Sequence, residues 1–392
     1  MTSAVVSHAG WFDGRLDLAS LALVGRDMTL AAEAVPAPAA GAPHHQKAVY
    51  PAAVTFPSLR EGPVTEVIGT IFTQLRGPAE KSGKDGDPCA CGSAEEAYAA
   101  CRVQLGIYQQ WHRAGLIQLI YQPSDGDVRP RQIGMACGPP PRYADEGVGT
   151  TFSANSGAPR VLLMLEGAGG VRDIEDLRTF YAAGVRIISL PFWIAASRWA
   201  GGNRSGGDLT AEGRTLVAEI DRLGMIHDVS HLSEKSFWSL LECSAGRICA
   251  THSNCRALLA GKERDERNLT DAQIRALLSR GDRQGVIGIN LYSAFLTVGR
   301  RAKIGDVVAH LQHICQISGR ADGIALGSDM DGGLSALDLP ENLDHPRHLH
   351  RLAEALADAG FTDNQIAGFQ AGNWRRFLDL STDSTDLHRL NF

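Results

Sequence analysis

Five side chains that can bind a metal ion follow five separate apolar runs of the sequence. They are Asp17, Glu166, His231, His252 and Asp329, each at or just after the end of a run with the composition of a β-strand. Two imidazoles with two or three carboxylates suit a divalent ion such as zinc. A single histidine at a strand end is more often packed or capping, so the prediction of a metal centre depends on the whole set converging.

The segment FDGRLDLA, residues 12–19, contains only half of a metal-binding pair. Asp17 can offer a carboxylate, and a histidine two residues earlier would complete an H-x-D pair of ligands. That position is Arg15, whose guanidinium is permanently charged, only donates hydrogen bonds and cannot ligate a cation. The residues alone therefore leave open how many ions the chain holds.

The polar residues can converge only if the strands that carry them are neighbours. Short apolar runs alternate with helical patterns, which is typical of parallel α/β architecture. Eight strands are expected, at residues 10–17, 64–72, 160–167, 185–190, 225–230, 247–252, 285–290 and 323–329. The expected helices include Ala94–Ala114, Asp173–Ala183, Thr210–Leu223, Glu234–Cys243, Asp271–Arg280 and Ile304–Ser318.

Eight strand–helix units predict an α/β fold of the (β/α)₈ TIM-barrel type, whose active site lies at the C-terminal ends of the strands. A doubly wound sheet is the rival, but polar residues end too many strands for a single crevice. We expect one domain over residues 1–392, with loop insertions at about 35–63 and 123–159 over the C-terminal face. Residues 111–115 and 344–352 are expected to be solvated surface.

The composition is that of an ordinary globular enzyme and excludes several classes of protein. Of the 392 residues, 44% are hydrophobic and 21% are charged. The formal net charge of -6 argues against a nucleic-acid surface, which usually carries a basic excess. Because neither an apolar run of about 18 residues nor a signal-peptide pattern occurs, we expect no membrane span and a cytoplasmic location.

The cysteines and the common nucleotide motifs add no second chemistry. Eight cysteines in a chain of this length do not make a disulfide scaffold. Cys89 and Cys91 lack the further partners of a zinc site, so reduced thiols that bind no metal are expected. The glycine-rich and G-x-S-x-G motifs of ATPases, dinucleotide-binding enzymes and serine hydrolases are absent.

Several longer motifs occur together and in order. LTAEGRTLVAEIDRLGMIHDVSHLSEKSFWSLL is followed by THSNCRAL, RNLTDAQIRALLSR, GVIGINLYSAFL, GIALGSDMDG and AGNWRRFL. From Trp11 to Leu378 the chain resembles the membrane (renal) dipeptidase family of zinc peptidases, and the D-x-S-H, H-S-N and G-S-D-x-D-G elements are specific in combination. The resemblance implies a (β/α)₈ metallohydrolase that cleaves dipeptides, commonly as a homodimer, with two zinc ions bridged by one carboxylate.

The resemblance also implies which residues bind metal. Glu166 matches the bridging carboxylate, while His231 and His252 match the ligands of one zinc ion. Asp17 matches the carboxylate ligand of the other zinc ion, and Arg15 stands where that ion's histidine is expected. One zinc ion is therefore expected, and the second site is in question.

Further matches concern the substrate. Asp329 matches the acid near the attacking water and the substrate amine, and it is expected to be catalytic together with Glu166. Arg267 matches the arginine that binds the substrate carboxylate, although the loop before it carries a short insertion. The family places a substrate-binding histidine after the fourth strand, where this chain has Phe192 in SLPFW.

Arg15 admits two interpretations. A guanidinium about 4 Å from a dication costs on the order of 8 kcal/mol before relaxation at an effective dielectric constant near 20. We hypothesise that Arg15 lies between Asp17 and Glu166 and substitutes electrostatically for the second ion. The alternative is that Arg15 points outward and a histidine from a loop supplies the ligand, namely His8, His44 or His45.

His227 lies four residues before His231, a spacing that keeps both on one face of a strand. It is interpreted as a buried structural histidine rather than as an extra ligand. Asp228 is expected to point to the opposite face and to support the loop.

Taken together, the residues and the resemblance predict a metal-dependent hydrolase that cleaves a dipeptide or related small amide through a metal-bound hydroxide, with Asp329 handling the proton. Arg15 and Phe192 keep two alternatives open. One is a catalytically impaired homologue that acts as a binding protein, and the other is a mononuclear hydrolase of another small amide or lactone. The expected partner is a small peptide or amide, with no nucleic acid or membrane, and the resemblance implies a homodimer.

Overall fold

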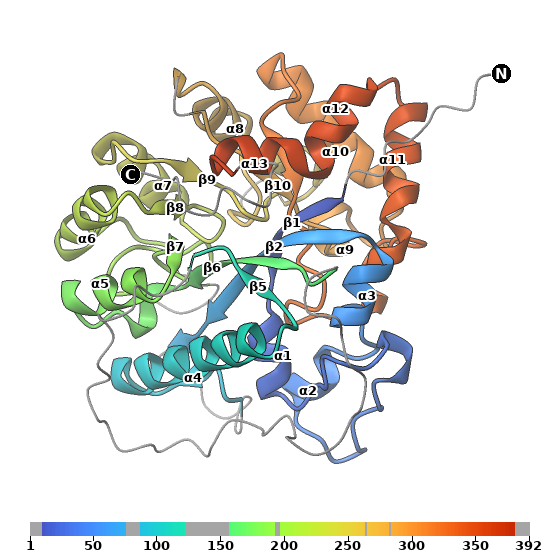
Figure 1. Ribbon diagram of the computed structural model, residues 1–392. Coiled ribbons are helices and arrows are strands. Elements are labelled where there is room, and N and C mark those ends of the chain that lie inside the picture. The colour runs from blue at the N-terminus through green and yellow to red at the C-terminus, as the bar shows by residue number, and fades with distance from the viewer. Residues whose placement is uncertain are drawn as a thin grey trace.

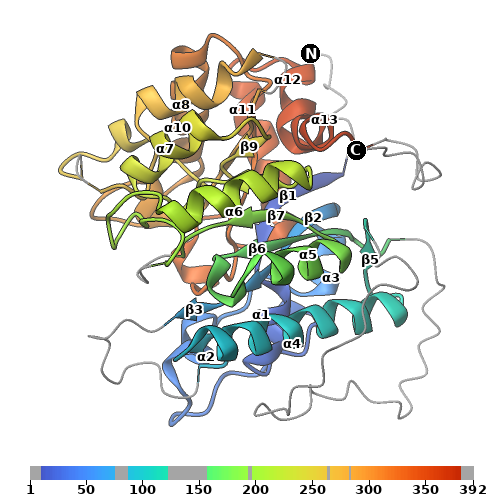
Figure 2. The ribbon, with the colours of Figure 1, turned by 90° about the vertical axis from the view of Figure 1, so that its left-hand side faces the viewer.

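The computed structural model describes residues 10–75, 87–121, 157–192, 197–262, 265–281 and 284–380. Parallel strands follow one another around the sheet in the order β10-β11-β1-β2-β6-β7-β8-β9. A parallel bridge between Ala250 and Ile287 joins the β9 side to β10 and closes the barrel. Figures 1 and 2 show helices around the outside of these strands. The predicted (β/α)₈ class is thus confirmed.

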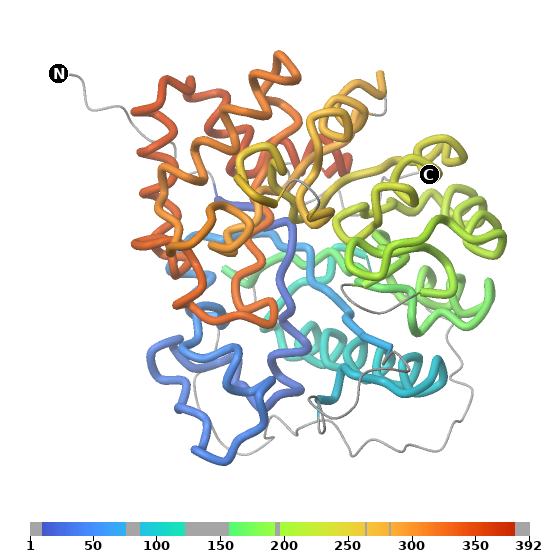
Figure 3. Tube along the Cα trace, turned by 180° about the vertical axis from the view of Figure 1, so that it is seen from behind, coloured from blue at the N-terminus to red at the C-terminus, as the bar shows by residue number. Residues whose placement is uncertain are grey.

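All eight predicted barrel strands are found. They are β1 (Trp11–Leu16), β2 (Val64–Phe72), β6 (Arg160–Glu166), β7 (Val185–Ser189), β8 (Ile226–Asp228), β9 (Ile248–Cys249), β10 (Ile287–Ile289) and β11 (Ile324–Leu326). Because β1 pairs with β11, the first strand of the barrel lies beside the last one (Figure 3).

The six predicted helices are also found, two with the predicted bounds and four with shifts of one or two residues at their ends. They are α4 (Ala94–Arg113), α5 (Ile174–Ala182), α6 (Ala211–Arg222), α7 (Glu234–Cys243), α8 (Asp271–Leu278) and α10 (Ile304–Ser318). Side-chain oxygens cap the first turns of five of them, from Ser93, Asp173, Thr210, Ser233 and Thr270. Within the described part of the chain, no helix is both long and apolar enough to cross a membrane.

Shorter elements connect these units. The helical ones are α1 (Leu18–Leu23), η1 (Ala32–Ala34), α2 (His44–Ala48), α3 (Phe56–Glu61), η2 (Ala168–Gly170), η3 (Arg256–Leu258), α9 (Ser293–Leu296), η5 (Ala336–Asp338), η6 (Pro346–His348), α11 (Leu349–Asp358), α12 (Asp363–Ala367), the π-helical η7 (Gly368–Gly372) and α13 (Asn373–Phe377). The short strands are β3 (Gln74–Leu75), β4 (Ala90–Cys91) and β5 (Gln118–Leu119).

The barrel interior is apolar in the layer nearer the N-terminal ends of the strands. The buried residues there include Phe12, Ile68, Leu162, Met164, Ile187, Ile226, Cys249 and Ala325. Trp374 of α13 packs among them and donates a hydrogen bond of 2.8 Å from Nε1 to the carbonyl oxygen of Leu326. Because side chains alternate along a strand, the inward positions two residues further on are Thr70, Glu166, Asp228 and Thr251. Polar groups therefore gather in the layer above, toward the C-terminal strand ends.

Strand β1 breaks this alternation. Phe12 packs in the interior, and a Cβ atom added to Gly14 would meet the ring of Trp374, so both positions face inward. Strict alternation would then send Arg15 and Asp17 outward, but the pairing of β1 with β2 shifts register between Asp13 and Leu16. This irregularity turns both polar residues into the barrel.

Two expectations about surface residues are wrong. Trp111 is fully buried and packs edge-on against Phe56, with ring centroids 5.0 Å apart. In residues 344–352, Leu349 and Leu352 are buried on the inner face of α11. In both segments, basic residues and histidines on the outer face obscure an apolar stripe.

The predicted insertion at 35–63 contains α2 and α3 and contributes to the wall of the central cavity. Asp331 ties it down, because its Oδ2 accepts hydrogen bonds from the amides of Ala53 at 2.9 Å and Val54 at 2.7 Å. Arg26 forms an ion pair with the same carboxylate. The predicted insertion at 123–159 lies almost wholly outside the described residues.

Candidate active site

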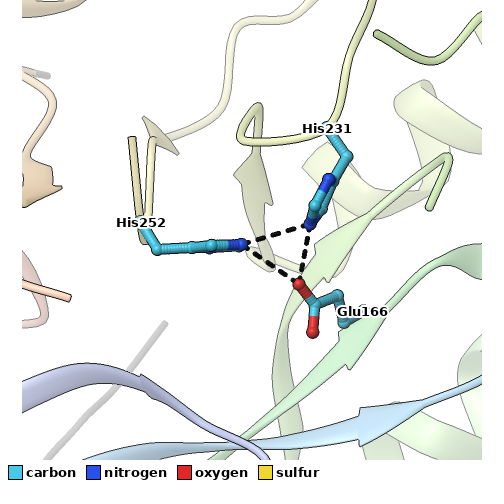
Figure 4. Close-up of side chains that lie close together, drawn as sticks. All are labelled: Glu166, His231 and His252. Carbon is cyan, nitrogen blue, oxygen red and sulfur yellow. Dashed lines mark hydrogen bonds and ion pairs between the residues drawn. The ribbon is translucent and has the colours of Figure 1, made fainter. Parts of the chain in front are cut away.

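Three buried side chains meet above the apolar layer (Figure 4). Glu166 ends β6, while His231 and His252 follow β8 and β9. Glu166 Oε1 lies 2.9 Å from His231 Nε2 and 3.3 Å from His252 Nε2, and the two Nε2 atoms are 3.1 Å apart. We refer to these three residues as the His₂Glu cluster.

The spacing of the His₂Glu cluster fits one tetrahedral metal ion. Zinc–ligand bonds of about 2.0 Å place neighbouring ligand atoms roughly 3.3 Å apart. The three distances of 2.9, 3.1 and 3.3 Å come close to this value. Two imidazoles and one carboxylate leave a fourth position for water or substrate, the arrangement typical of catalytic zinc sites.

The charge states of the cluster favour metal binding. Burial lowers the pKa of His231 to about 4 and that of His252 well below its usual range, so both imidazoles are neutral at pH 7. Burial alone would raise the pKa of Glu166, but Arg15 and His231 outweigh it and bring the pKa to about 2. The cluster therefore offers two nitrogen lone pairs and one carboxylate.

A hydrogen-bonded relay holds His252 in a defined tautomer. Ser230 Oγ donates to Asp228 Oδ1 at 2.7 Å and thereby uses its only hydrogen. With a metal ion on Nε2, neutral His252 carries its proton on Nδ1, so Thr251 Oγ1, 3.3 Å from Ser230 Oγ, donates its own proton to Ser230. Thr251 Oγ1 accepts in turn from His252 Nδ1 at 2.7 Å. The relay thus keeps the proton of His252 on Nδ1, and the lone pair of Nε2 faces the cluster.

Replacing Thr251 by valine is expected to weaken zinc binding about 10- to 100-fold, because the isosteric side chain no longer fixes the His252 tautomer. Competition with a chromogenic chelator measures the affinity, and ¹⁵N chemical shifts of the histidines report the tautomer. Thr251→Ser keeps the hydroxyl and should bind zinc like the native chain. Equal zinc affinity of the valine variant and the native chain would contradict the role of the relay.

Arg15 lies within a cage of three carboxylates and is only 3% exposed. Its Nη2 atom lies 3.0 Å from Asp17 Oδ2 and 2.7 Å from Glu166 Oε2, and Nη1 forms an ion pair with Asp329. We call this group the Arg15 cage. Burial alone would lower the pKa of Arg15, but the carboxylates of Asp17 and Glu166 raise it above its ordinary value, so the guanidinium stays charged.

Arg15 thus lies between Asp17 and Glu166, as hypothesised, and the outward orientation is wrong. Of the histidines offered as substitute ligands, His44 and His45 are on α2 and line the cavity outside the His₂Glu cluster. His8 lies outside the described residues.

The four predicted metal ligands are not all together. Among the described residues, the group with metal-binding spacing contains Glu166, His231 and His252 but not Asp17. Asp17 instead accepts hydrogen bonds from Arg15 and from the hydroxyl of Thr70. Burial and the nearby Glu166 raise its pKa to about 6, although Arg15 opposes the shift.

Asp329 follows β11 and faces the Arg15 cage. Its backbone has φ of 60°, a left-handed conformation that few residues other than glycine adopt. Asn290 donates from Nδ2 to Asp329 Oδ2 at 2.8 Å, and Asn254 holds the backbone of Asn290. The strained turn and these hydrogen bonds together aim the carboxylate into the site.

A cavity of about 390 Å³ lies over these groups. Arg267 lines it, is 2% exposed and donates from Nη2 to the carbonyl oxygen of His252 at 2.9 Å. Burial lowers the pKa of Arg267 to about 10, so it remains cationic. Phe192 lines the other side, with its ring centroid 4.3 Å from that of Phe72 and 5.0 Å from that of His231.

His227 is structural, as interpreted, but its orientation is opposite to the expected one. Its Nε2 lies 2.7 Å from Asp221 Oδ1 of α6, on the outside of the barrel. The inward residue is Asp228, which the alternation from Ile226 places below the metal ligands. Asp228 does support the loop, as expected, through Ser230 and the amide of Thr251.

The cysteines take no part in the metal cluster of the described residues. Cys89 and Cys91 are buried, and Cys91 Sγ donates to the carbonyl oxygen of Cys89 at 3.7 Å. Burial raises the pKa of Cys89 well above its usual range, which keeps it a thiol.

Sequence reasoning missed several residues that position the site. They are Asp13, Thr70, Thr251 and Asn290. Asp13, for example, accepts from the amide of Ser328 at 2.8 Å and from that of Arg15 at 3.2 Å, and so joins β1 to the loop that carries Asp329. Thr251 was the one most open to prediction, because it directly precedes a proposed ligand.

Comparisons with known proteins identify the family of this chain. A family model described as membrane dipeptidase, Peptidase family M19, matches residues 148–386. An uncharacterized protein in the pqqA 5' region of Klebsiella pneumoniae is 38% identical over 227 residues, 55% of this chain and 79% of that protein. An uncharacterized dipeptidase of Schizosaccharomyces pombe is 34% identical over 187 residues, 45% of this chain and 43% of the yeast protein.

Solved structures share the fold. A metallo peptidase from Rhodobacter sphaeroides, liganded with a phosphinate mimic of the dipeptide L-Ala-D-Ala, superposes with a TM-score of 0.68 at 22% identity, over 95% of this chain and 99% of that one. The probable dipeptidase PvdM from Pseudomonas aeruginosa gives a TM-score of 0.67 at 17% identity, over 95% of both chains.

Proposed function

The chain belongs to the membrane dipeptidase family, and from this premise we propose that it is a metal-dependent hydrolase of a dipeptide or a related small amide. The observation that carries the proposal is the His₂Glu cluster, in which two neutral imidazoles and one carboxylate share the spacing of a single metal ion. Its location at the C-terminal strand ends is where TIM-barrel enzymes keep their active sites.

The proposed cofactor is one zinc ion, held by Glu166, His231 and His252. A divalent ion there supplies Lewis acidity toward an amide carbonyl and lowers the pKa of water. Zinc suits this mixed nitrogen and oxygen donor set. A second ion beside Asp17 is disfavoured, because the guanidinium of Arg15 takes up that space and supplies a positive charge.

The remaining roles fall to residues that line the cavity. Asp329 accepts a proton from the attacking water and returns it to the leaving nitrogen, and Asn290 orients its carboxylate. Arg267 holds a carboxylate of the substrate. Glu166 both ligates the ion and anchors Arg15.

Two substitutions relative to the family favour a second candidate, a mononuclear hydrolase of another small amide or lactone. Arg15 stands in place of a metal-binding histidine, and Phe192 stands in place of a substrate-binding histidine. The loss of one such hydrogen-bond donor changes rates by about 10²–10³-fold. A cytoplasmic location and a homodimer remain predictions.

The test is turnover by zinc-loaded protein. Purified chain with one equivalent of zinc should hydrolyse at least one stereoisomer of alanyl-alanine or of the corresponding N-acyl alanines. A chelator should abolish activity, and zinc should restore it. His252→Ala should lose both zinc and turnover while its circular dichroism stays native. Full zinc occupancy with no hydrolysis of any of these compounds would refute the proposal and favour a binding protein.

A further inference from the structure

We propose that the substrate carries a carboxylate on its amine-derived side and no free amino group on its acyl side, as in an N-acyl amino acid. The inference rests on the proposed hydrolase function and narrows its substrate class. It follows from which charged groups of the cavity are already paired within the protein and which are left for a ligand.

The deep carboxylates of the cavity are already paired. Asp17 and Asp329 form ion pairs with Arg15, and Asp331 forms one with Arg26 while also accepting two backbone amides. Among the aspartates of the described residues that line the cavity, the remaining one is Asp87. It is partly exposed, and one of its oxygens accepts from the amide of Cys89 at 2.9 Å. Among the aspartates that the structure shows lining the cavity, an ammonium group would thus find no buried carboxylate without a partner.

Arg15 makes the cavity still less suitable for a substrate with a free amino group. Its guanidinium is buried and lies among the groups that would surround the scissile carbonyl. A second cation at contact distance would be repelled, and an ammonium would also lose its hydration without gaining a partner. The Arg15 cage therefore acts against substrates with a free amino group.

Arg267, by contrast, favours a substrate that carries a carboxylate. It is buried, and its Nε has no hydrogen-bond partner among the residues that the structure describes. The ring of Phe295 lies 4.6 Å from its guanidinium carbon and shields one face. A buried guanidinium with an unused donor matches the planar, anionic geometry of a carboxylate.

The acyl side of the substrate would meet an aromatic wall. Phe72 and Phe192 pack edge to face, and Phe192 contacts the ring of His231. Arg267, by contrast, bonds the carbonyl oxygen of His252. A carbonyl held at the His₂Glu cluster would thus have an apolar surface toward Phe192 and a cation toward Arg267. This combination suits an apolar acyl group joined to an amino acid.

The decisive experiment compares two ligands that differ only in the ammonium group, alanyl-alanine and N-propionyl-alanine, each with D- and L-alanine at the carboxyl end. Isothermal titration calorimetry on zinc-loaded native protein measures both affinities. N-propionyl-alanine is expected to bind roughly tenfold more tightly or better, since only the dipeptide places an unpaired cation beside Arg15. Equal or tighter binding of alanyl-alanine, or no binding of N-propionyl-alanine, would overturn the inference.

Two variants identify the residues responsible. Arg15→Gln removes the cation and frees its carboxylates, so the preference for the propionyl compound should shrink or reverse. Arg267→Gln should weaken both ligands alike, because both carry the same carboxylate. The native comparison stands even if a variant fails to fold. Tight binding of N-propionyl-alanine without hydrolysis would refute the hydrolase proposal alone, whereas hydrolysis with alanyl-alanine preferred would refute this inference alone.

Discussion

Replacing Arg15 by histidine is expected to raise the number of tightly bound divalent ions from one to two per chain. Arg15 Nη2 contacts both Asp17 and Glu166, so its guanidinium takes up the space between the two carboxylates. A dication about 4 Å from that charge would face a cost on the order of 8 kcal/mol. A histidine removes the charge and adds a neutral nitrogen ligand next to Asp17.

Mass spectrometric metal analysis of protein purified without chelator, with titration of added zinc, measures this stoichiometry. Arg15→Gln is the matched control, because it removes the charge without supplying an imidazole and should bind the second ion much more weakly than the histidine variant. Two ions in the native chain would show that Arg15 does not exclude the second ion. No ion in the native chain would undermine the metal site itself.

Replacing Asp329 by asparagine is expected to lower kcat by about 10²–10⁴-fold, the usual contribution of a positioned general acid or base. The amide has nearly the shape of the carboxylate, so Asn290 can still contact it, but it cannot accept a proton. The KM for the best substrate should change far less than kcat, because Arg267 and the aromatic wall are untouched.

Zinc content provides the internal control for this variant, since Asp329 is outside the His₂Glu cluster and one ion should remain. Steady-state kinetics on the zinc-loaded variant gives kcat and KM separately. A loss confined to KM would point to a role in substrate binding, and an unchanged kcat would exclude Asp329 as the proton carrier.

The sequence predicted the barrel well because its strands are buried on both faces and read as nearly continuous apolar runs. β6 and β10, for instance, stand out from polar flanks without any tertiary information. The C-terminal ends of such strands converge by topology, so Glu166, His231 and His252 could be grouped in advance. Short helices such as α1 and α3 were missed because six residues carry too little helical periodicity.

The orientation of individual polar side chains was less predictable. The register shift in β1 brings Arg15 and Asp17 inward, and Asp13 supports it through contacts with Ser328, more than three hundred residues away in sequence. The relay from Asp228 to His252 likewise joins two separate strand ends. Local spacing contains no information about such long-range contacts, which is why His227 was expected to face inward.

The Arg15 cage bears on the order of events during biosynthesis. Where buried acidic groups have only a metal ion for neutralisation, the ion must arrive before the chain can complete its fold. Here the guanidinium of Arg15 already forms ion pairs with Asp17, Glu166 and Asp329, and the histidine nitrogens of the His₂Glu cluster are uncharged. The chain can therefore fold before it binds zinc. The supply of zinc would then determine the fraction of folded protein that is active, and not the fraction of the protein that folds.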